Sequence, residues 1–374
     1  MFEPIHLIFH NSPSLVTMES EAYLEKMKKI YGALLDFIES GEDKEILFQE
    51  LIKLLDNQKV FENPKEIQSF LHIISKVSKN HHCSPCFFSC IERILLNFKE
   101  EIKKFVTNSK IFTIFKGNKK IILFLIKEGI IIVDQFVLNE LKSDKYFNFF
   151  KPEIKDFIDK EKVGEIPENF EIKRQTGEND SYICELIRND NVEEFCAFCN
   201  RSNLSFSQTI IDNSDFETNS FLIGKKPSLI EYAAFFGSIQ IFQYLQMNKV
   251  ELKPSLWLYA IHSKSSELIH LLEENHVIPD DKTYNECLVE AIKCHHNDIA
   301  RYIKDNLLQI DERNPFDVTP IFFEYYNFEF IQPDLINESN FNVLCRYDYE
   351  ILVEDLWKKG NIDINSMKIQ IIIV

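Results

Sequence analysis

The stretch SLIEYAAFFGSIQIFQYL, residues 228–245, decides the fold that we expect for this chain of 374 residues. On both sides of Gly237 its apolar side chains recur at the three- and four-residue steps of a helix. Small Ala233 and Ala234 allow a close approach between helices, and glycine tolerates the positive φ that a tight turn often requires. The apolar stripe of the second helix consists of Ile241, Phe242 and Leu245. The stretch therefore predicts a hairpin of two short, closely packed helices.

The same register can be laid over further segments of the chain. These begin at residues 181, 228, 255, 286, 319 and 339, at intervals of 47, 27, 31, 33 and 20 residues, and a weaker copy begins at residue 108. The long interval leaves room for an insertion around residues 212–224, and the short one implies a truncated unit. In these segments some residues correspond to the small packing residues, the apolar stripe, the helix cap or the loop glycine of the hairpin. They are Ala260, Leu268, Leu272, Ala291, Ile299, Ile303, Thr319, Pro320 and Gly360. We expect Thr319 to cap a helix and Pro320 to occupy its first turn.

These residues resemble the ankyrin repeat, whose period is about 33 residues. The chain is most similar to the divergent ankyrin proteins, rich in Phe, Ile and Asn, that are expanded in some parasitic protists. In those proteins such repeats often follow a helical N-terminal region of unassigned function. The resemblance implies an all-α solenoid of helical pairs that serves as a scaffold, with no known chemistry.

The apolar pattern divides the chain into five parts. Residues 1–17 lack periodicity and are expected to form a flexible arm. Residues 18–160 carry helical stripes, and we expect either a separate α-helical domain or a continuation of the same stack. The charged segment 161–180 is predicted to be a polar linker, residues 181–365 the degenerate repeats, and residues 366–374 an apolar tail.

Composition limits the possible partners and location. A formal net charge of −17 argues against nucleic acid as the main partner, because binding a phosphate backbone needs Lys and Arg, and it favours a basic protein partner. The longest apolar stretch, residues 121–133, is interrupted by charges, and no secretory signal is visible, so we expect no membrane association. Nine scattered cysteines fit reduced thiols in the cytoplasm or nucleus.

Two clusters could carry chemistry. Residues 81–90 read HHCSPCFFSC, and a metal-binding alternative would use its His and Cys side chains as zinc ligands. These candidate ligands are His81, His82, Cys83, Cys86 and Cys90. The four-residue spacing of the last two is also explained by core thiols on a helix. At residues 294–296, Cys-His-His occupies a turn between helices, where we expect an exposed polar turn rather than a catalytic pair.

Trp257 has two interpretations. It either packs between neighbouring repeats or forms an exposed aromatic anchor for a partner. The sequence as a whole predicts a non-enzymatic scaffold that binds a protein partner and needs no cofactor. The alternatives are a zinc-binding module or metal-dependent enzyme centred on residues 81–90, and repeats that serve only in homodimerisation.

Overall fold

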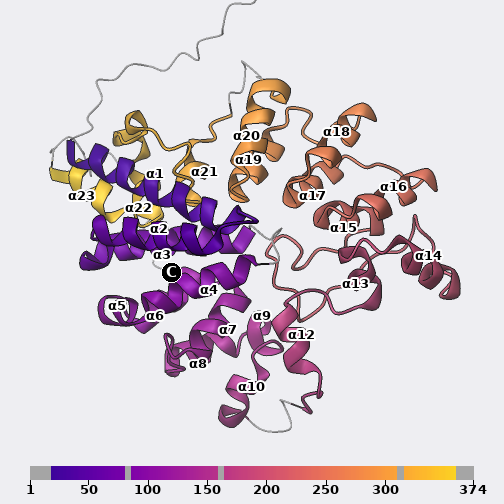
Figure 1. The fold of residues 1–374 in the computed structure, drawn as a ribbon, viewed down its shortest axis with the longest axis horizontal. Coiled ribbons are helices and arrows are strands. Elements are labelled where there is room, and N and C mark those ends of the chain that lie inside the picture. Colours follow the sequence, from indigo (N-terminus) through magenta and orange to yellow (C-terminus); the bar gives the residue numbers. More distant parts are fainter. Residues whose placement is uncertain (1–17, 81–85, 159–163, 310–315, 359–374) are drawn as a thin grey trace, which may run out of the picture.

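The computed structural model describes residues 18–80, 86–158, 164–309 and 316–358 (Figure 1). Within these ranges the chain folds into helices without a strand, and one isolated antiparallel bridge joins Ile210 to Ser228. The prediction of an all-α fold is confirmed for this part of the chain. None of the described helices combines the length and apolar character needed to cross a lipid bilayer. The predicted arm at 1–17, the tail at 366–374 and Gly360 lie outside the described residues.

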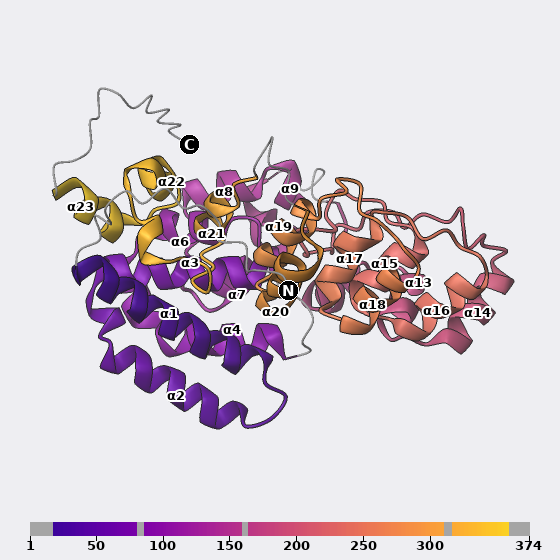
Figure 2. The same ribbon diagram turned by 90° about the horizontal axis from the view of Figure 1, so that it is seen from above.

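The N-terminal half is a layered arrangement of helices in which α1 packs on α2, α4 and α23 (Figures 1 and 2). Its first helix has the apolar stripe that the sequence predicts, and Leu24, Met27 and Leu34 are buried on it. The elements of this half are α1 (Met18–Glu39), α2 (Lys44–Asn57), η1 (Val60–Glu62), α3 (Pro64–Asn80), α4 (Phe87–Asn97), α5 (Lys99–Phe105), α6 (Asn108–Phe115), α7 (Lys119–Lys127), α8 (Gln135–Leu141), α9 (Asp144–Phe147), α10 (Lys151–Ile154) and η2 (Lys155–Phe157).

The middle of the chain is a row of helical pairs that extends away from this half (Figure 2). The first helices α13, α15, α17 and α19 pack successively on one another, and each also packs on the second helix of its own pair. The elements are α12 (Phe170–Thr176), α13 (Tyr182–Arg188), α14 (Val192–Arg201), α15 (Leu229–Phe236), α16 (Ile239–Met247), α17 (Leu256–Ser263), α18 (Ser266–Glu274), α19 (Asn285–Lys293), α20 (Asn297–Tyr302) and η3 (Ile303–Leu307). The predicted packing and stripe positions within these pairs are buried, apart from the half-buried Ile299: Ala233, Ala234, Ile241, Leu245, Ala260, Leu268, Leu272, Ala291 and Ile303.

The turn inside each pair repeats one backbone conformation. A left-handed residue follows the first helix at Asp190, Gly237, Lys264 and His295, with φ between 48° and 70°. At three of these turns the next N–H donates to the carbonyl five residues back, as Ser238 does to Ala233 at 3.0 Å. The expected positive φ at Gly237 is therefore present, and the same turn recurs with residues that tolerate it less well.

Gly237→Ala is expected to lower the free energy of unfolding by about 1–2 kcal/mol, because an L-residue is strained at a φ of 70°. A Cβ at this position would meet Ser263 at an ordinary contact distance of 3.4 Å, so the cost comes from the backbone. Urea denaturation measures the change. Gly32→Ala is the control, since this helical glycine has open space around it and alanine should stabilise by up to about 1 kcal/mol. Equal stability of Gly237→Ala and wild type would contradict the turn geometry.

The predicted repeat region 181–365 is divided between two hydrophobic cores. One core spans residues 184–303, whereas buried side chains from 323–356 join the core of the N-terminal half. Contacts across this junction include Ser20 hydrogen-bonded to Asp355 and the His72 ring stacked on Tyr326 at 4.9 Å. The elements of this last segment are α21 (Thr319–Glu324), η4 (Pro333–Leu335), η5 (Glu338–Asn340), α22 (Phe341–Arg346) and α23 (Glu350–Lys358). The C-terminal helices therefore close onto α1 instead of extending the row.

Two local predictions differ from the structure. The segment predicted as a linker contains α12, and its Arg174 is buried against Glu153 of α10 at 2.6 Å. This charged segment packs because its arginine finds acidic partners. At the start of α21, Pro320 lies in the first turn as expected, but Thr319 is the first helical residue, and its N–H is capped by the Asp317 carboxylate at 2.9 Å.

Candidate functional site

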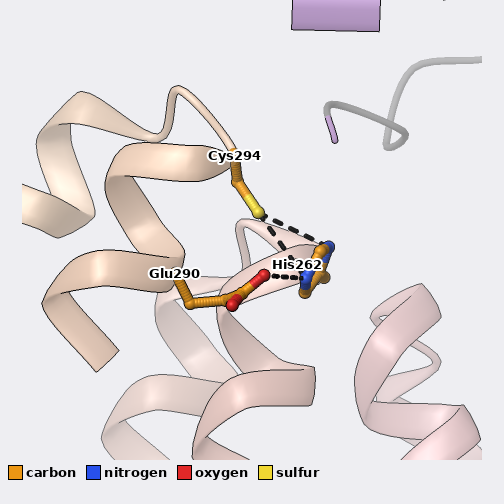
Figure 3. A group of neighbouring side chains, drawn as sticks. All are labelled: His262, Glu290 and Cys294. Atoms are coloured by element: carbon orange, nitrogen blue, oxygen red, sulfur yellow. Dashed lines mark hydrogen bonds and ion pairs between the residues drawn. The ribbon is translucent and has the colours of Figure 1, made fainter. Parts of the chain in front are cut away.

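Three side chains with catalytic or metal-binding chemistry converge between α17 and α19 (Figure 3). His262 lies in the last turn of α17, and Glu290 and Cys294 lie one turn apart at the end of α19, so both face the neighbouring helix. The His262 Nε2 and Glu290 Oε1 atoms are 2.9 Å apart. The Cys294 Sγ atom is 3.4 Å from Nδ1 and 3.6 Å from Nε2 of the same ring. The stacking of first helices thus creates a His–Glu–Cys cluster.

The cluster is enclosed by aromatic rings. The centroids of the Phe221 and Phe235 rings lie 4.2 and 4.9 Å from that of His262. Burial lowers the pKa of His262 more than its hydrogen bond to Glu290 raises it. Burial also raises the pKa of Glu290, but the His262 hydrogen bond and the Lys293 charge outweigh this, so the pKa lies below its usual value. Both pKa shifts agree with a neutral His262 imidazole whose Nε2–H donates to an ionised Glu290 carboxylate. The Nδ1 atom can then accept a hydrogen bond from the Cys294 thiol.

A thiol, an imidazole and a carboxylate in this order form the arrangement that activates a cysteine nucleophile. Such a nucleophile must reach its substrate, however, and Cys294 is 0% exposed. The cavity beside the cluster is lined by Glu290 but not by His262 or Cys294. The geometry therefore has the partners of a nucleophilic site but no opening at the sulfur.

The same three residues have the donor set of a zinc site, with ligand atoms that all lie within 4.8 Å of one another. Zinc holds nitrogen and oxygen ligands at about 2.0–2.1 Å, which places tetrahedral neighbours roughly 3.3 Å apart. The 2.9 Å separation between His262 and Glu290 is instead the length of a direct hydrogen bond. The described conformation consequently fits a hydrogen-bonded triad better than a metal centre.

The turn between α19 and α20, expected to be exposed, is buried where the N-terminal half meets the row of pairs. The Tyr31 hydroxyl lies 3.0 Å from His295 Nδ1 and 3.1 Å from Asn327 Oδ1. Asn297 donates to the same hydroxyl at 3.1 Å, and His296 has 0% exposure. The expectation of a polar surface turn is wrong because Tyr31 of α1 covers it. These contacts form a polar junction between the two cores.

The predicted zinc cluster is only partly described. His81, His82 and Cys83 lie outside the described residues. Cys86 is exposed just before α4, whereas Cys90 is buried in the N-terminal core. Helical spacing therefore predicts the environment of Cys90 correctly and that of Cys86 incorrectly. The zinc hypothesis itself stays a prediction.

Trp257 is a core residue. Its side chain is fully buried, its Nε1–H donates to the Val277 carbonyl at 2.7 Å, and its ring meets Tyr284 edge-on at 5.1 Å. The alternative of an exposed anchor is therefore wrong in this conformation. The sequence did not single out His262 or Glu290. Only the repeat register, which sets α17 beside α19, could have suggested that these residues meet.

Comparisons of the chain with protein-family models, with curated proteins and with solved structures found no match. The ankyrin resemblance therefore stays a prediction from the sequence. The chemistry of the His–Glu–Cys cluster has to be argued from its own geometry.

Cys294 is expected to react with a thiol reagent at least about 100-fold more slowly than Cys86 in the native protein. The buried thiol becomes accessible only when the structure opens, and an opening free energy of about 3 kcal/mol already gives that factor. Timed alkylation followed by peptide mass spectrometry measures both rates in one sample. Rapid labelling of Cys294 without urea would show an open site and would favour the catalytic interpretation.

Proposed function

We propose that this chain is a non-enzymatic scaffold that binds a protein partner on a stack of degenerate ankyrin-type helical pairs. The observation that carries the proposal is the row of first helices α13, α15, α17 and α19, each with its second helix beside it. In such a row the interior positions are fixed by packing, while the surface residues of helices and loops are free to vary. This is the property that a binding scaffold requires.

The net charge of the chain and the burial of the His–Glu–Cys cluster give further support to the scaffold proposal. A net charge of −17 accelerates association with a basic partner, and this contribution weakens as salt is added. The His–Glu–Cys cluster has its sulfur closed to solvent in the described conformation, which favours a structural role for it over turnover of a substrate. A partner bound to the surface of the row needs no access to this cluster.

Site-specific photocrosslinking in the native cell tests the proposal. Benzoylphenylalanine replaces Met247 or Ile278, which are 75% and 55% exposed on the row of pairs. The matched controls are Ile46 and Ile132, which are 58% and 65% exposed on the N-terminal half. We expect an adduct with the same second protein from both row positions and none from the controls.

Two outcomes would contradict the scaffold proposal. Equal adducts from row and control positions would show non-specific contact. An adduct that contains only two copies of this chain would favour repeats that serve in homodimerisation. Pulling down the crosslinked protein at increasing salt then tests the charge argument, since a basic partner should be captured less efficiently.

A further inference from the structure

A cavity of about 360 Å³ lies where three separate parts of the chain meet. It is bordered by the end of α3, by the segment 220–225, by α17 and α19, and by the residue that follows α21. Helices α3 and α19 are in contact, and both contribute to the lining, so the cavity lies at the junction between the N-terminal half and the row of pairs. Lysines Lys79, Lys225 and Lys293 contribute to its lining, and we call it the lysine cavity.

The lysine cavity has an excess of positive charge in an acidic protein. Lys293 is paired with Glu290 at 3.3 Å, and Glu290 is the single carboxylate among the described residues that line the cavity. Within the described residues, Lys79 and Lys225 have no carboxylate within ion-pair distance. Neither does Lys76, whose Nζ lies 5.2 Å from the centroid of the Tyr325 ring at the cavity wall. The Lys225 Nζ atom lies 3.2 Å from the centroid of the Phe221 ring, which attracts the ammonium but carries no compensating charge. Partly buried cations are normally paired, so among the described residues these lysines lack an anion.

The protonated forms of the same lysines are destabilised by burial and by the positive charges of neighbouring lysines. Burial and the neighbouring charge of Lys79 together lower the pKa of Lys76 to about 8, although Glu324 opposes them. Burial lowers the pKa of Lys79, with contributions from Lys145 and Lys293, although Glu324 opposes them. For Lys225, burial and the Lys293 charge outweigh the attraction of Glu290. A bound anion would reverse these effects by favouring the protonated ammonium groups.

A neutral donor at the cavity also lacks its acceptor. Asn80 is 7% exposed and lines the cavity. Its Oδ1 accepts a hydrogen bond from the Ser220 hydroxyl at 2.9 Å, but its Nδ2 has no partner in the part of the chain that the structure describes. Buried amide donors are nearly always hydrogen-bonded, so this group independently indicates a ligand with acceptor oxygens.

We propose that the lysine cavity binds a compact anion that carries one or more phosphate groups. Lysines from α3, from segment 220–225 and from α19 line the cavity on several sides, and their flexible side chains can donate hydrogen bonds to the tetrahedral oxygens of a phosphate. A planar carboxylate is better matched by the fork of an arginine, and none of the described residues that line the cavity is an arginine. The volume lies within the range of small-molecule sites and exceeds what a single phosphate fills. The ligand would bind across the junction of the two cores.

Calorimetric titration of the full chain in low-chloride buffer tests this proposal. The probes are inorganic phosphate, pyrophosphate and glucose 6-phosphate, which distinguish a free phosphate from a phosphorylated organic ligand. We expect one site per chain for at least one probe. Lys79→Met and Lys225→Met should each weaken binding by about tenfold or more, because a charge-assisted hydrogen bond is lost. Lys226→Met is the matched control, since this neighbour is paired with Asp212 and does not line the cavity.

The titration distinguishes specific anion binding in the lysine cavity from general attraction to a basic surface. Because removing an unpaired lysine relieves repulsion, both variants should fold, and an unchanged circular dichroism spectrum verifies this. Absence of binding for all three probes would overturn the proposal. Equal weakening in Lys226→Met would also overturn it, because it would show general attraction to a basic surface. Neither result would bear on partner capture by the row of pairs, so the two proposals fail separately.

Discussion

Replacing Trp257 by alanine is expected to lower the free energy of unfolding by about 3–5 kcal/mol, the usual cost of truncating a buried aromatic side chain. The indole has no solvent exposure, and its removal leaves a cavity beside Tyr284. It also leaves the Val277 carbonyl without the N–H that now lies 2.7 Å away. Since Trp257 joins α17 to the chain after α18, the loss should weaken the packing between these neighbouring pairs.

The chain contains only one other tryptophan, and it supplies the control. Trp357 is 55% exposed near the end of α23, so Trp357→Ala should change stability by no more than about 0.5 kcal/mol. Urea denaturation followed by circular dichroism compares the two variants. In Trp357→Ala the remaining fluorescence reports Trp257 alone and should shift to the red on unfolding. A stable Trp257→Ala variant that loses its partner would restore the interpretation as a binding anchor.

The repeat register is the part of the fold that could be predicted from sequence. A glycine between two apolar stripes indicates the turn at Gly237, and the aligned packing and stripe positions between Ala260 and Ile303 lie in helices. The corresponding left-handed residues in other pairs are Asp190, Lys264 and His295, which give no glycine signal. The helical pairs share this turn although their sequences differ there, because packing of the two helices can hold residues in a backbone conformation that they do not favour.

The junction between the two cores could not be predicted. An apolar stripe shows that a helix face is buried, but it does not show which element covers it. Residues 319–356 therefore fitted the repeat register although they pack on α1 and α3, through pairs such as Ser20 with Asp355. The His–Glu–Cys cluster was missed for the same reason. Its members lie in two helices whose contact is a property of the stack and not of either segment.

The linker prediction for residues 161–180 was wrong for a different reason, which concerns charged side chains. The segment 161–180 has the composition of a linker, since sequence alone does not distinguish a solvated arginine from one enclosed by acidic partners. Arg174 donates to Glu153 and Glu171 at 2.6 Å each and to the Phe149 carbonyl at 3.2 Å. Its side chain is only 2% exposed. It therefore holds α12 against α10, in a place where a linker would make no contact.

Arg174→Ala is accordingly expected to lower the free energy of unfolding by about 3–5 kcal/mol, because it leaves the largely buried Glu153 carboxylate without a cation. Arg201→Ala is the matched control: this arginine also pairs with a glutamate at 2.6 Å, but on the surface, where such pairs contribute about 0–1 kcal/mol. Adding Glu153→Gln to Arg174→Ala should recover part of the loss by removing the stranded charge. Urea denaturation of the four proteins, wild type included, measures these differences. If Arg174→Ala were as stable as Arg201→Ala, the linker prediction would stand and α12 would be only loosely attached to the N-terminal half.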